Sequence, residues 1–425
     1  MATNHTDKAQ RNPETCPGHA PAPRLKPLNL LLGLSLAAWG MQAAHAADPA
    51  PAPNAPEVVK VEGFRITPNI SVTEAYDDNV YGTPNIELDD TITTVDASVK
   101  ANSDWVRHRL NLDAGVSADY YADYDSEDVV DWWLGADGRY DLSAKSHALG
   151  GLLFRQDHED RSSPDSALLA KDPTTYQTNR AHLGFAHQLA PFTVRLGGVV
   201  EQLDFEKGST PFFDVNQRDR VQYSLGTRFS YQLNPNREVF FQAATDTREY
   251  DDDTVGRDSD GYRLGLGLRI KQGADFDAEG FLGYLAQDYD DIALKDVSAA
   301  YFGANLKWKP AANTRITATL DRAVSETTLT GASSYLETSV GGHIEHDLTP
   351  QFTLNATLSF VNSDYQGVDL ELDEWVAGAG ARYYFDNNVF LSGGYRYTTR
   401  DADIVIYEYD RSEFFLTVGY APRSR

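Results

Sequence analysis

The 425-residue sequence has one cysteine, two methionines and a marked shortage of basic residues. A single cysteine cannot build a disulfide framework or a thiolate metal site, since both need several cysteines. Lys and Arg together number 37 against 63 Asp and Glu, which gives a formal net charge of -26. This balance argues against nucleic acid as a partner, because phosphate contacts require a basic face.

Long apolar runs are also missing from the chain after its N-terminal segment. No later stretch reaches the roughly 18 apolar residues that a membrane-spanning helix needs. This excludes a helical membrane protein but not a β-barrel, whose strands cross a membrane with alternating rather than continuous apolar residues.

Residues 1–46 have the order of a secretory signal peptide. Arg24 and Lys26 precede an apolar stretch at 28–41, and the small-residue site Ala44-His45-Ala46 follows it. Positive charge, a short apolar core and an A-x-A site are the features of a cleaved export signal, and the core is too short to span a bilayer. The alternative interpretation is a buried core helix.

Strict alternation of apolar and polar residues dominates the chain from Gly63 onward. Over 221–231 the odd positions are Val, Tyr, Leu, Thr, Phe and Tyr, while the even positions are Gln, Ser, Gly, Arg and Ser. The same alternation occurs over 106–120 and 262–270. A period of two predicts β-strands with one apolar face. Their length of about 10 to 16 residues exceeds the usual five or six and suits strands that cross a bilayer at a tilt.

About eighteen such strands can be counted up to Tyr420, joined by short turns that alternate with longer acidic loops. This asymmetry is typical of outer-membrane barrels, with short turns in the periplasm and long loops outside the cell. A soluble β-sandwich or propeller also alternates, but it would use shorter strands and cover its apolar face with a second sheet. The predicted strand starts are Phe64, Thr91, Trp105, Asp128, His147, Thr175, Phe192, Arg218, Glu238, Gly261, Asp275, Val297, Arg315, Tyr335, Phe352, Asp373, Val389 and Arg411.

We therefore predict an all-β fold: a transmembrane antiparallel up-and-down β-barrel of about 18 strands, in the outer membrane of a Gram-negative bacterium. The predicted division of the chain is a cleaved signal peptide at 1–46, a Pro-rich periplasmic tether at 47–62, the barrel at 63–420 and a short tail at 421–425.

If the apolar positions of each strand face lipid, the alternate positions line the interior. These inward positions, here called the inward parity, are rich in arginine. One interpretation is a set of cross-strand ion pairs that stabilises the wall. Another is a hydrated conduit in which guanidinium groups offer paired donors to carboxylates, hydroxyls or phosphates, and the two are compatible. The lumen-lining candidates are Arg107, Arg109, Asp113, Arg139, Arg195, Arg228, Arg263, Arg269, Arg315, Arg382 and Arg396.

The sequence offers little support for catalysis or for a cofactor. His343 and His346 are three residues apart, so on a strand they point to opposite faces and cannot share a metal ion. Acidic loops such as 288–291 carry oxygen ligands that suit calcium, but none completes a twelve-residue calcium loop ending in Glu. We expect no enzyme activity, no metal site and no cofactor, although a hydrolase assembled from distant strands would leave no local pattern.

The segment ITPNISVTEAYDDNVYG at 66–82, followed by the run from Trp105 through WWLGADGRY, resembles the putative β-barrel porin type 2 family of Gram-negative bacteria. The resemblance covers essentially the whole chain after the signal. It implies an outer-membrane barrel associated with exopolysaccharide synthesis and export. It also implies a periplasmic polysaccharide-export protein and a polysaccharide co-polymerase as partners, and it supplies no catalytic residue.

The function expected from these observations is a passive conduit for exopolysaccharide export. The alternatives are a general diffusion or nutrient porin, a structural or adhesive surface barrel, and an outer-membrane enzyme. The expected partners are outer-membrane lipid and lipopolysaccharide, the barrel assembly machinery, and the export protein with its exopolysaccharide, but no nucleic acid. Many such barrels end on an aromatic residue that the assembly machinery recognises, whereas here Tyr420 is followed by residues 421–425.

Overall fold

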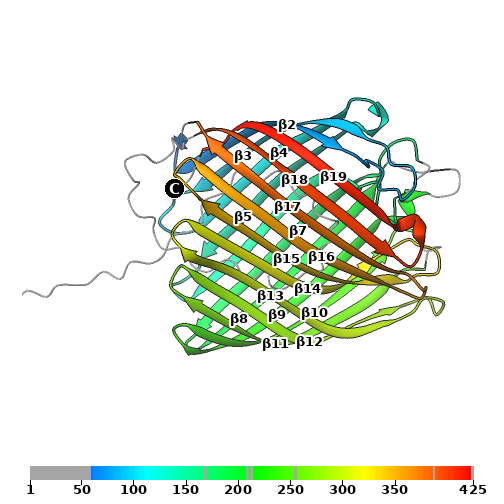
Figure 1. Cartoon of the computed structure of the whole chain (residues 1–425). Coiled ribbons are helices and arrows are strands. Elements are labelled where there is room, and N and C mark those ends of the chain that lie inside the picture. Colours follow the sequence, from blue (N-terminus) through cyan, green and yellow to red (C-terminus); the bar gives the residue numbers. More distant parts are fainter. Residues whose placement is uncertain are drawn as a thin grey trace, which may run out of the picture.

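In the computed structural model the chain forms a closed antiparallel β-barrel (Figure 1). The structure describes residues 59–166, 170–206, 210, 214–252, 256–385 and 388–422, so the predicted signal peptide and most of the predicted tether lie outside the described residues. The sheet has 19 strands, and without the short β1 the remaining 18 close the ring. This confirms the predicted fold class.

The strands are β1 (Val59–Val61), β2 (Phe64–Asp77), β3 (Asp90–Ser103), β4 (Arg109–Tyr121), β5 (Val129–Asp141), β6 (Ser146–His158), β7 (Thr175–Leu189), β8 (Phe192–Phe205), β9 (Arg220–Asn234), β10 (Arg237–Tyr250), β11 (Ser259–Gln272), β12 (Phe276–Tyr289), β13 (Val297–Ala311), β14 (Thr314–Glu326), β15 (Ser334–Asp347), β16 (Phe352–Gln366), β17 (Glu371–Tyr384), β18 (Val389–Ala402) and β19 (Tyr409–Tyr420). The 3-10 helices η1 (Asp125–Glu127), η2 (Val215–Arg218) and η4 (Val405–Tyr407) lie in connections between strands.

Each strand of the ring pairs with its neighbours in the sequence, and the last strand pairs with the first. The β19–β2 ladder runs from Glu413 opposite Asp77 to Tyr420 opposite Ile70. The short β1 pairs with the first residues of β2, which β19 does not reach. A ring closed in this way leaves no open sheet edge along which other chains could pair.

One end of the barrel carries short turns such as 190–191 and 235–236, and the other carries longer connections such as 78–89 and 159–174. We call these the short-turn end and the long-loop end. Of the eighteen predicted starts, all but one lie within two residues of the observed starts. The short connection between β17 and β18 lies partly outside the described residues.

The predicted start of the strand at Trp105 is wrong. β3 continues to Ser103 and β4 begins only at Arg109, so 104–108 form the turn. Arg107 was expected on the inward face of a strand, but it is an exposed turn residue whose guanidinium donates to the backbone oxygen of Asp141 at 2.9 Å. Val106 and His108 continue the even positions of the next strand into this turn, and therefore the period alone could not locate the bend.

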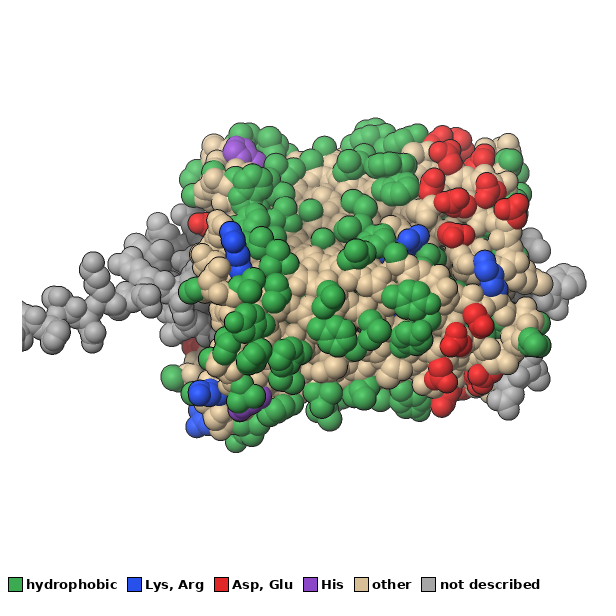
Figure 2. Space-filling model, turned by 90° about the horizontal axis from the view of Figure 1, so that it is seen from below, with side chains coloured by type: hydrophobic (Ala, Val, Ile, Leu, Met, Phe, Trp, Pro, Cys, Tyr) green, Lys and Arg blue, Asp and Glu red, His purple; other side chains and the backbone are tan. Residues whose placement is uncertain are grey.

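The alternate strand positions that point outward, here called the outward parity, form an apolar belt around the barrel. Leu266, in the middle of β11, is 68% exposed, whereas Arg263 on the same strand is buried. Figure 2 shows hydrophobic side chains spread over the wall, with acidic side chains gathered toward one end. Among the described residues there is no helix long and apolar enough to cross a membrane.

Part of the inward parity is apolar, which the sequence analysis did not predict. Phe240, Phe281 and Tyr301 belong to one buried cluster on β10, β12 and β13. The rings lie over glycines of neighbouring strands, since a Cβ added to Gly267 would overlap Phe240 and one added to Gly303 would overlap Phe281. On these strands both parities carry apolar residues, so alternation could not reveal which ones turn inward.

Candidate functional site

The connection between β6 and β7 folds into the barrel and is fastened at several points around the ring. Its described first part, residues 159–166, is here called the mouth loop. Three consecutive side chains of this loop, Glu159, Asp160 and Arg161, each form an ion pair with a different part of the barrel. The mouth loop therefore crosses the interior instead of projecting outward.

Arg161 fastens the mouth loop to the connection between β4 and β5. Its Nε donates to Glu127 Oε2 at 2.8 Å, and its Nη2 donates to Glu127 Oε1 at 3.0 Å. Tyr81, in the connection between β2 and β3, also donates to Glu127 Oε1 at 3.2 Å. Burial, together with the charge of Glu127 and this hydrogen bond, raises the pKa of Tyr81 to about 12. The phenol therefore remains a donor throughout the physiological pH range.

Glu159 fastens the mouth loop to η2, between β8 and β9. Arg218 Nη1 donates to Glu159 Oε2 at 2.9 Å, and Arg218 Nη2 donates to Glu159 Oε1. The two side chains are only 6% and 4% exposed, and the guanidinium lies 4.1 Å from the centroid of the Phe205 ring. Burial opposes the charged form of Arg218, but the charge of Glu159 and its hydrogen bonds outweigh this and raise the pKa of Arg218.

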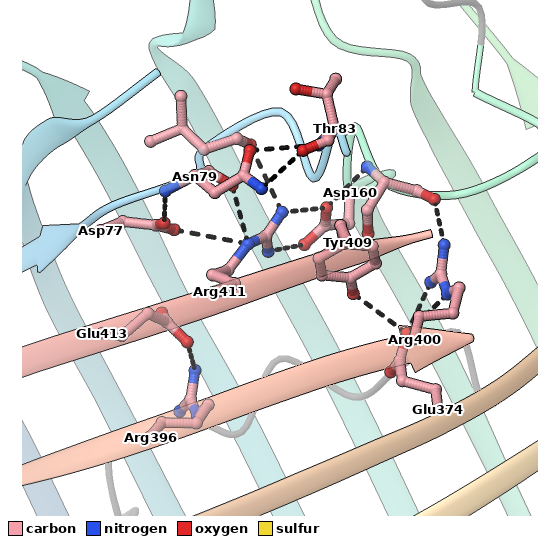
Figure 3. A network of polar contacts seen from close by, with 12 residues as sticks. Asp77, Asn79, Thr83, Asp160, Glu374, Arg396, Arg400, Tyr409, Arg411 and Glu413 are labelled. Carbon is pink, nitrogen blue, oxygen red and sulfur yellow. Dashed lines mark hydrogen bonds and ion pairs between the residues drawn. The ribbon is translucent and has the colours of Figure 1, made fainter. Parts of the chain in front are cut away.

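On the side of β18 and β19, two arginines contact the mouth loop. Arg411 Nη1 donates to Asp160 Oδ2 at 3.0 Å, while its Nε donates to the backbone oxygen of Asn79 at 3.0 Å. Arg400 Nη1 donates to the backbone oxygen of Ser162 at 2.6 Å. Figure 3 shows Arg411 between Asp160 and the β2–β3 connection, with Arg400 beside it. These arginines join β18 and β19 to the mouth loop, and Arg411 also joins β19 to the β2–β3 connection.

The mouth loop also meets the connection between β14 and β15. Asp165 Oδ1 accepts hydrogen bonds from Thr327 Oγ1 at 2.6 Å and from the backbone nitrogen of Thr328 at 2.9 Å. The β14–β15 and β6–β7 connections lie far apart in the order of strands around the ring. Their contact therefore requires that they meet over the interior.

The end of β14 separates from β13 but stays paired with β15, up to Glu326 opposite Ser334. The β13–β14 ladder ends at Gly303 opposite Asp321, so the last residues of β14 have no ladder partner in β13. Glu326, the last residue of β14, accepts a hydrogen bond from Tyr250 Oη at 2.6 Å and is paired with Arg248. Tyr250 and Arg248 belong to β10, which is not a neighbour of β14. This end of β14 thus leans into the interior.

Together these contacts narrow the interior at the long-loop end. The mouth loop is held from the sides of β4, β8, β14, β18 and β19, and several of the contacts are buried ion pairs. Removing one member of a buried ion pair typically costs about 3–5 kcal/mol because the other charge is left without a partner. The charged side chains of these ion pairs therefore lie in the interior at this end.

Gly82 gives a test of how closely the mouth loop is packed. It has a φ of +57, and an added Cβ would overlap the Cβ of Ser162. Gly273 has a φ of +62 with no atom near an added Cβ. Both Gly→Ala changes carry the cost of a left-handed residue, roughly 1–2 kcal/mol, and only Gly82→Ala also displaces the mouth loop. We expect trypsin to cut after Arg161 faster in Gly82→Ala than in Gly273→Ala, and equal rates would contradict this packing.

The predicted lumen-lining residues are spread around the wall rather than gathered at the mouth loop. Most of the inward arginines lie beside a carboxylate, as the ion-pair interpretation expects. Arg109 lies opposite Arg139, Arg382 lies 4.7 Å from the Phe390 ring centroid, and Asp113 accepts from the Trp133 indole. The ion pairs are Arg139 with Asp141 (2.8 Å), Arg195 with Glu238 (3.8 Å), Arg228 with Glu279 (2.8 Å), Arg263 with Asp246 (3.3 Å), Arg269 with Asp277 (2.7 Å), Arg315 with Glu345 (2.9 Å) and Arg396 with Glu413 (2.8 Å).

The residues that hold the mouth loop were not among the predicted site residues. Arg218 lies 59 residues from its partner Glu159, and Arg411 lies 251 residues from Asp160. The only local signal was the length of the β6–β7 connection and the position of Arg161 among acidic neighbours. Within the described ranges, no group of three or more His, Cys, Asp or Glu side chains is placed to hold a metal ion.

Comparison with known proteins gives one matching family and a number of solved structures. The family model described as Putative beta-barrel porin 2 matches residues 52–421. Among solved structures the chain is similar to OccK2 (OpdF) of Pseudomonas aeruginosa, at 12% identity over 85% of this chain and 98% of that one, with a TM-score of 0.46. It is also similar to OpdL of the same organism, at 13% identity over 85% and 99% of the two chains, with a TM-score of 0.43. No match was found among the curated proteins.

Proposed function

The chain belongs to the Putative beta-barrel porin 2 family, and from this premise we propose that it is a selective channel for small solutes in the outer membrane of a Gram-negative bacterium. The short-turn end then faces the periplasm, and the acidic long-loop end faces outward. This is the diffusion or nutrient porin that the sequence analysis held as an alternative.

The observation that carries the proposal is the mouth loop fastened across the interior. Buried ion pairs to Glu127 and Arg218 hold it on one side, and Asp165 joins it to Thr327 on another. A segment held in this way limits the size of what can pass. It suits the selection of small solutes better than the passage of a folded or bulky polymer.

Exopolysaccharide export is the second candidate, and one observation favours it. A cavity of about 330 Å³ at the short-turn end is lined by several Lys and Arg side chains. A polymer that leaves the cell would enter the barrel at this end, and basic side chains could receive acidic groups of its sugars. In this case the mouth loop would have to move aside for each chain.

Size exclusion in reconstituted vesicles separates the two candidates. We expect the purified barrel to admit monosaccharides and disaccharides in a liposome-swelling assay and to exclude longer neutral oligosaccharides. The mouth loop is the physical reason, since it divides the interior. Swelling rates that stay high with long oligosaccharides would contradict a selective channel.

Deletion of the gene supplies an independent readout. A small-solute channel predicts slower growth on particular solutes with an unchanged amount of surface polysaccharide. A polymer exporter predicts loss of surface polysaccharide with normal growth on those solutes. Complementation with the intact chain is the control in both measurements.

A further inference from the structure

The cavity at the short-turn end is strongly basic, although the chain as a whole is strongly acidic. It is lined by the ends of strands β5 to β11 and by two of the short turns. Its volume is about 330 Å³. Glu238 is the only carboxylate among the residues that line it. The basic side chains that line it are Arg139, Lys145, His147, His187, Arg195, Arg237, Arg269 and Lys271.

The arrangement of arginines around this cavity is not the one that wall stability alone would select. Arg195 on β8 lies directly opposite Arg228 on β9. Arg109 on β4 likewise lies directly opposite Arg139 on β5. Like charges directly opposite each other on neighbouring strands destabilise a sheet. These opposed pairs concentrate positive charge beside the cavity, and the carboxylates that pair with Arg139, Arg228 and Arg269 do not line it.

Arg195 has donors to spare. Its nearest carboxylate oxygen, Glu238 Oε1, is 3.8 Å from Nη1, which is beyond hydrogen-bonding distance. Within the part of the chain that the structure describes, the Arg195 guanidinium makes no hydrogen bond, and the side chain is 24% exposed. Its planar group of donors is thus presented to the cavity.

The two other inward arginines of the cavity are fixed in place. Arg269 is hydrogen-bonded to Asp277, with Nη2 to Oδ2 at 2.7 Å and Nε to Oδ1 at 2.9 Å. Arg139 Nε donates to Asp141 Oδ1 at 2.8 Å. Neither Asp277 nor Asp141 lines the cavity. The two guanidinium groups therefore contribute positive charge from fixed positions on either side of Arg195.

We propose that this cavity is a binding site for a small anionic solute that carries a carboxylate or a phosphate group. The inference rests on the proposed channel function, because it names the class of solute that the channel takes. Arg195 binds the anionic group through paired N–H donors, an arrangement that matches the geometry of both groups. The recessed volume is at the small end of ligand pockets and suits one small molecule or the end of a chain rather than a protein surface.

The test is block of single-channel current in planar bilayers. Galacturonate, inorganic phosphate and neutral galactose are added in turn to each side of the membrane at constant KCl concentration. We expect galacturonate or phosphate to block from the short-turn side at lower concentration than from the long-loop side, and galactose not to block. Which of the two anions blocks more strongly distinguishes a carboxylate from a phosphate ligand.

Arg195→Gln is the decisive variant. It should raise the half-blocking concentration roughly tenfold or more, as expected for loss of a charge-assisted hydrogen bond. Arg180→Gln is the matched control, since Arg180 is an inward arginine on β7 that pairs with Glu201 and does not line the cavity. It should leave the half-blocking concentration within about twofold. If Arg195→Gln does not fold, Arg195→Lys keeps the charge but not the planar donors and should still weaken block.

Two outcomes would overturn the site: equal block by galactose and galacturonate, or block that is unchanged by both Arg195 variants. Failure of the proposed channel is distinguishable from either. If the intact barrel conducts no current, galacturonate and phosphate binding is measured by titration calorimetry in detergent. Binding of an anion that is weakened in the Arg195 variants and retained in Arg180→Gln supports the site, and no binding to the intact barrel overturns it.

Discussion

Replacing Arg218 by methionine should open the long-loop end and raise the single-channel conductance. Methionine leaves the Glu159 carboxylate buried and without its partner, since both side chains are almost completely covered. The expected cost is about 3–5 kcal/mol. Moving the mouth loop out of the interior would return Glu159 to water and remove this cost. The measurement is the conductance in KCl of the full barrel in planar bilayers.

The double variant Arg218→Met with Glu159→Leu separates the lost ion pair from a general disturbance of η2. Replacing both members of a buried ion pair by apolar side chains is often neutral or stabilising. The double variant should therefore return the conductance toward that of the intact chain. Asp290→Asn, which removes an exposed carboxylate from the β12–β13 connection, is the control for loss of charge at this end. An unchanged conductance in the single variant would show that Glu159 does not hold the mouth loop.

The strands could be predicted from the sequence because the signal is local. Each strand alternates over its own residues, so the starts at Phe64, Thr175 and Val297 follow from period two alone. The turn at 104–108 was not predicted because Val106 and His108 keep the even positions of the next strand. A pattern that is continuous through a bend carries no information about the bend.

The site could not be predicted in the same way because its contacts are not local. Arg400 and Arg411 reach the mouth loop only because closure of the ring brings the last strands near residues 160–162. No periodicity marks an arginine that will meet a loop more than 200 residues away. The inward aromatic cluster escaped for a related reason, since Phe240 turns inward onto a glycine of the neighbouring strand.

The two ends of the barrel differ in charge, and this difference bears on how fast an anion enters from each side. Acidic side chains gather at one end of the wall (Figure 2), while the cavity at the short-turn end is basic. Like charges repel at a channel entrance and opposite charges concentrate a solute there. An anion should therefore enter more readily from the short-turn end. With galacturonate at equal concentration on both sides of the bilayer, reversing the potential would measure this difference as unequal galacturonate current in the two directions.

Leu266→Arg tests whether the outward parity contacts lipid. Leu266 lies at the centre of β11 with its side chain 68% exposed, and Leu264 and Leu268 flank it on the same face. An arginine at the midplane of a bilayer destabilises a barrel by roughly 2–4 kcal/mol, and one near the interface by roughly 0–1 kcal/mol. The measurement is the free energy of unfolding in lipid vesicles, from denaturant titration of tryptophan fluorescence.

Leu233→Arg is the matched control for Leu266→Arg. Leu233 has the same outward parity and a similar exposure of 53%, but it lies near the short-turn end of β9. If the belt is immersed in lipid, the two variants should differ by about 2 kcal/mol or more, because only Leu266 lies at the depth where water cannot reach the guanidinium. Equal and small costs at both positions would mean that water surrounds the belt. Every assignment of inward residues, including Arg195 and the mouth loop, would then lose its basis.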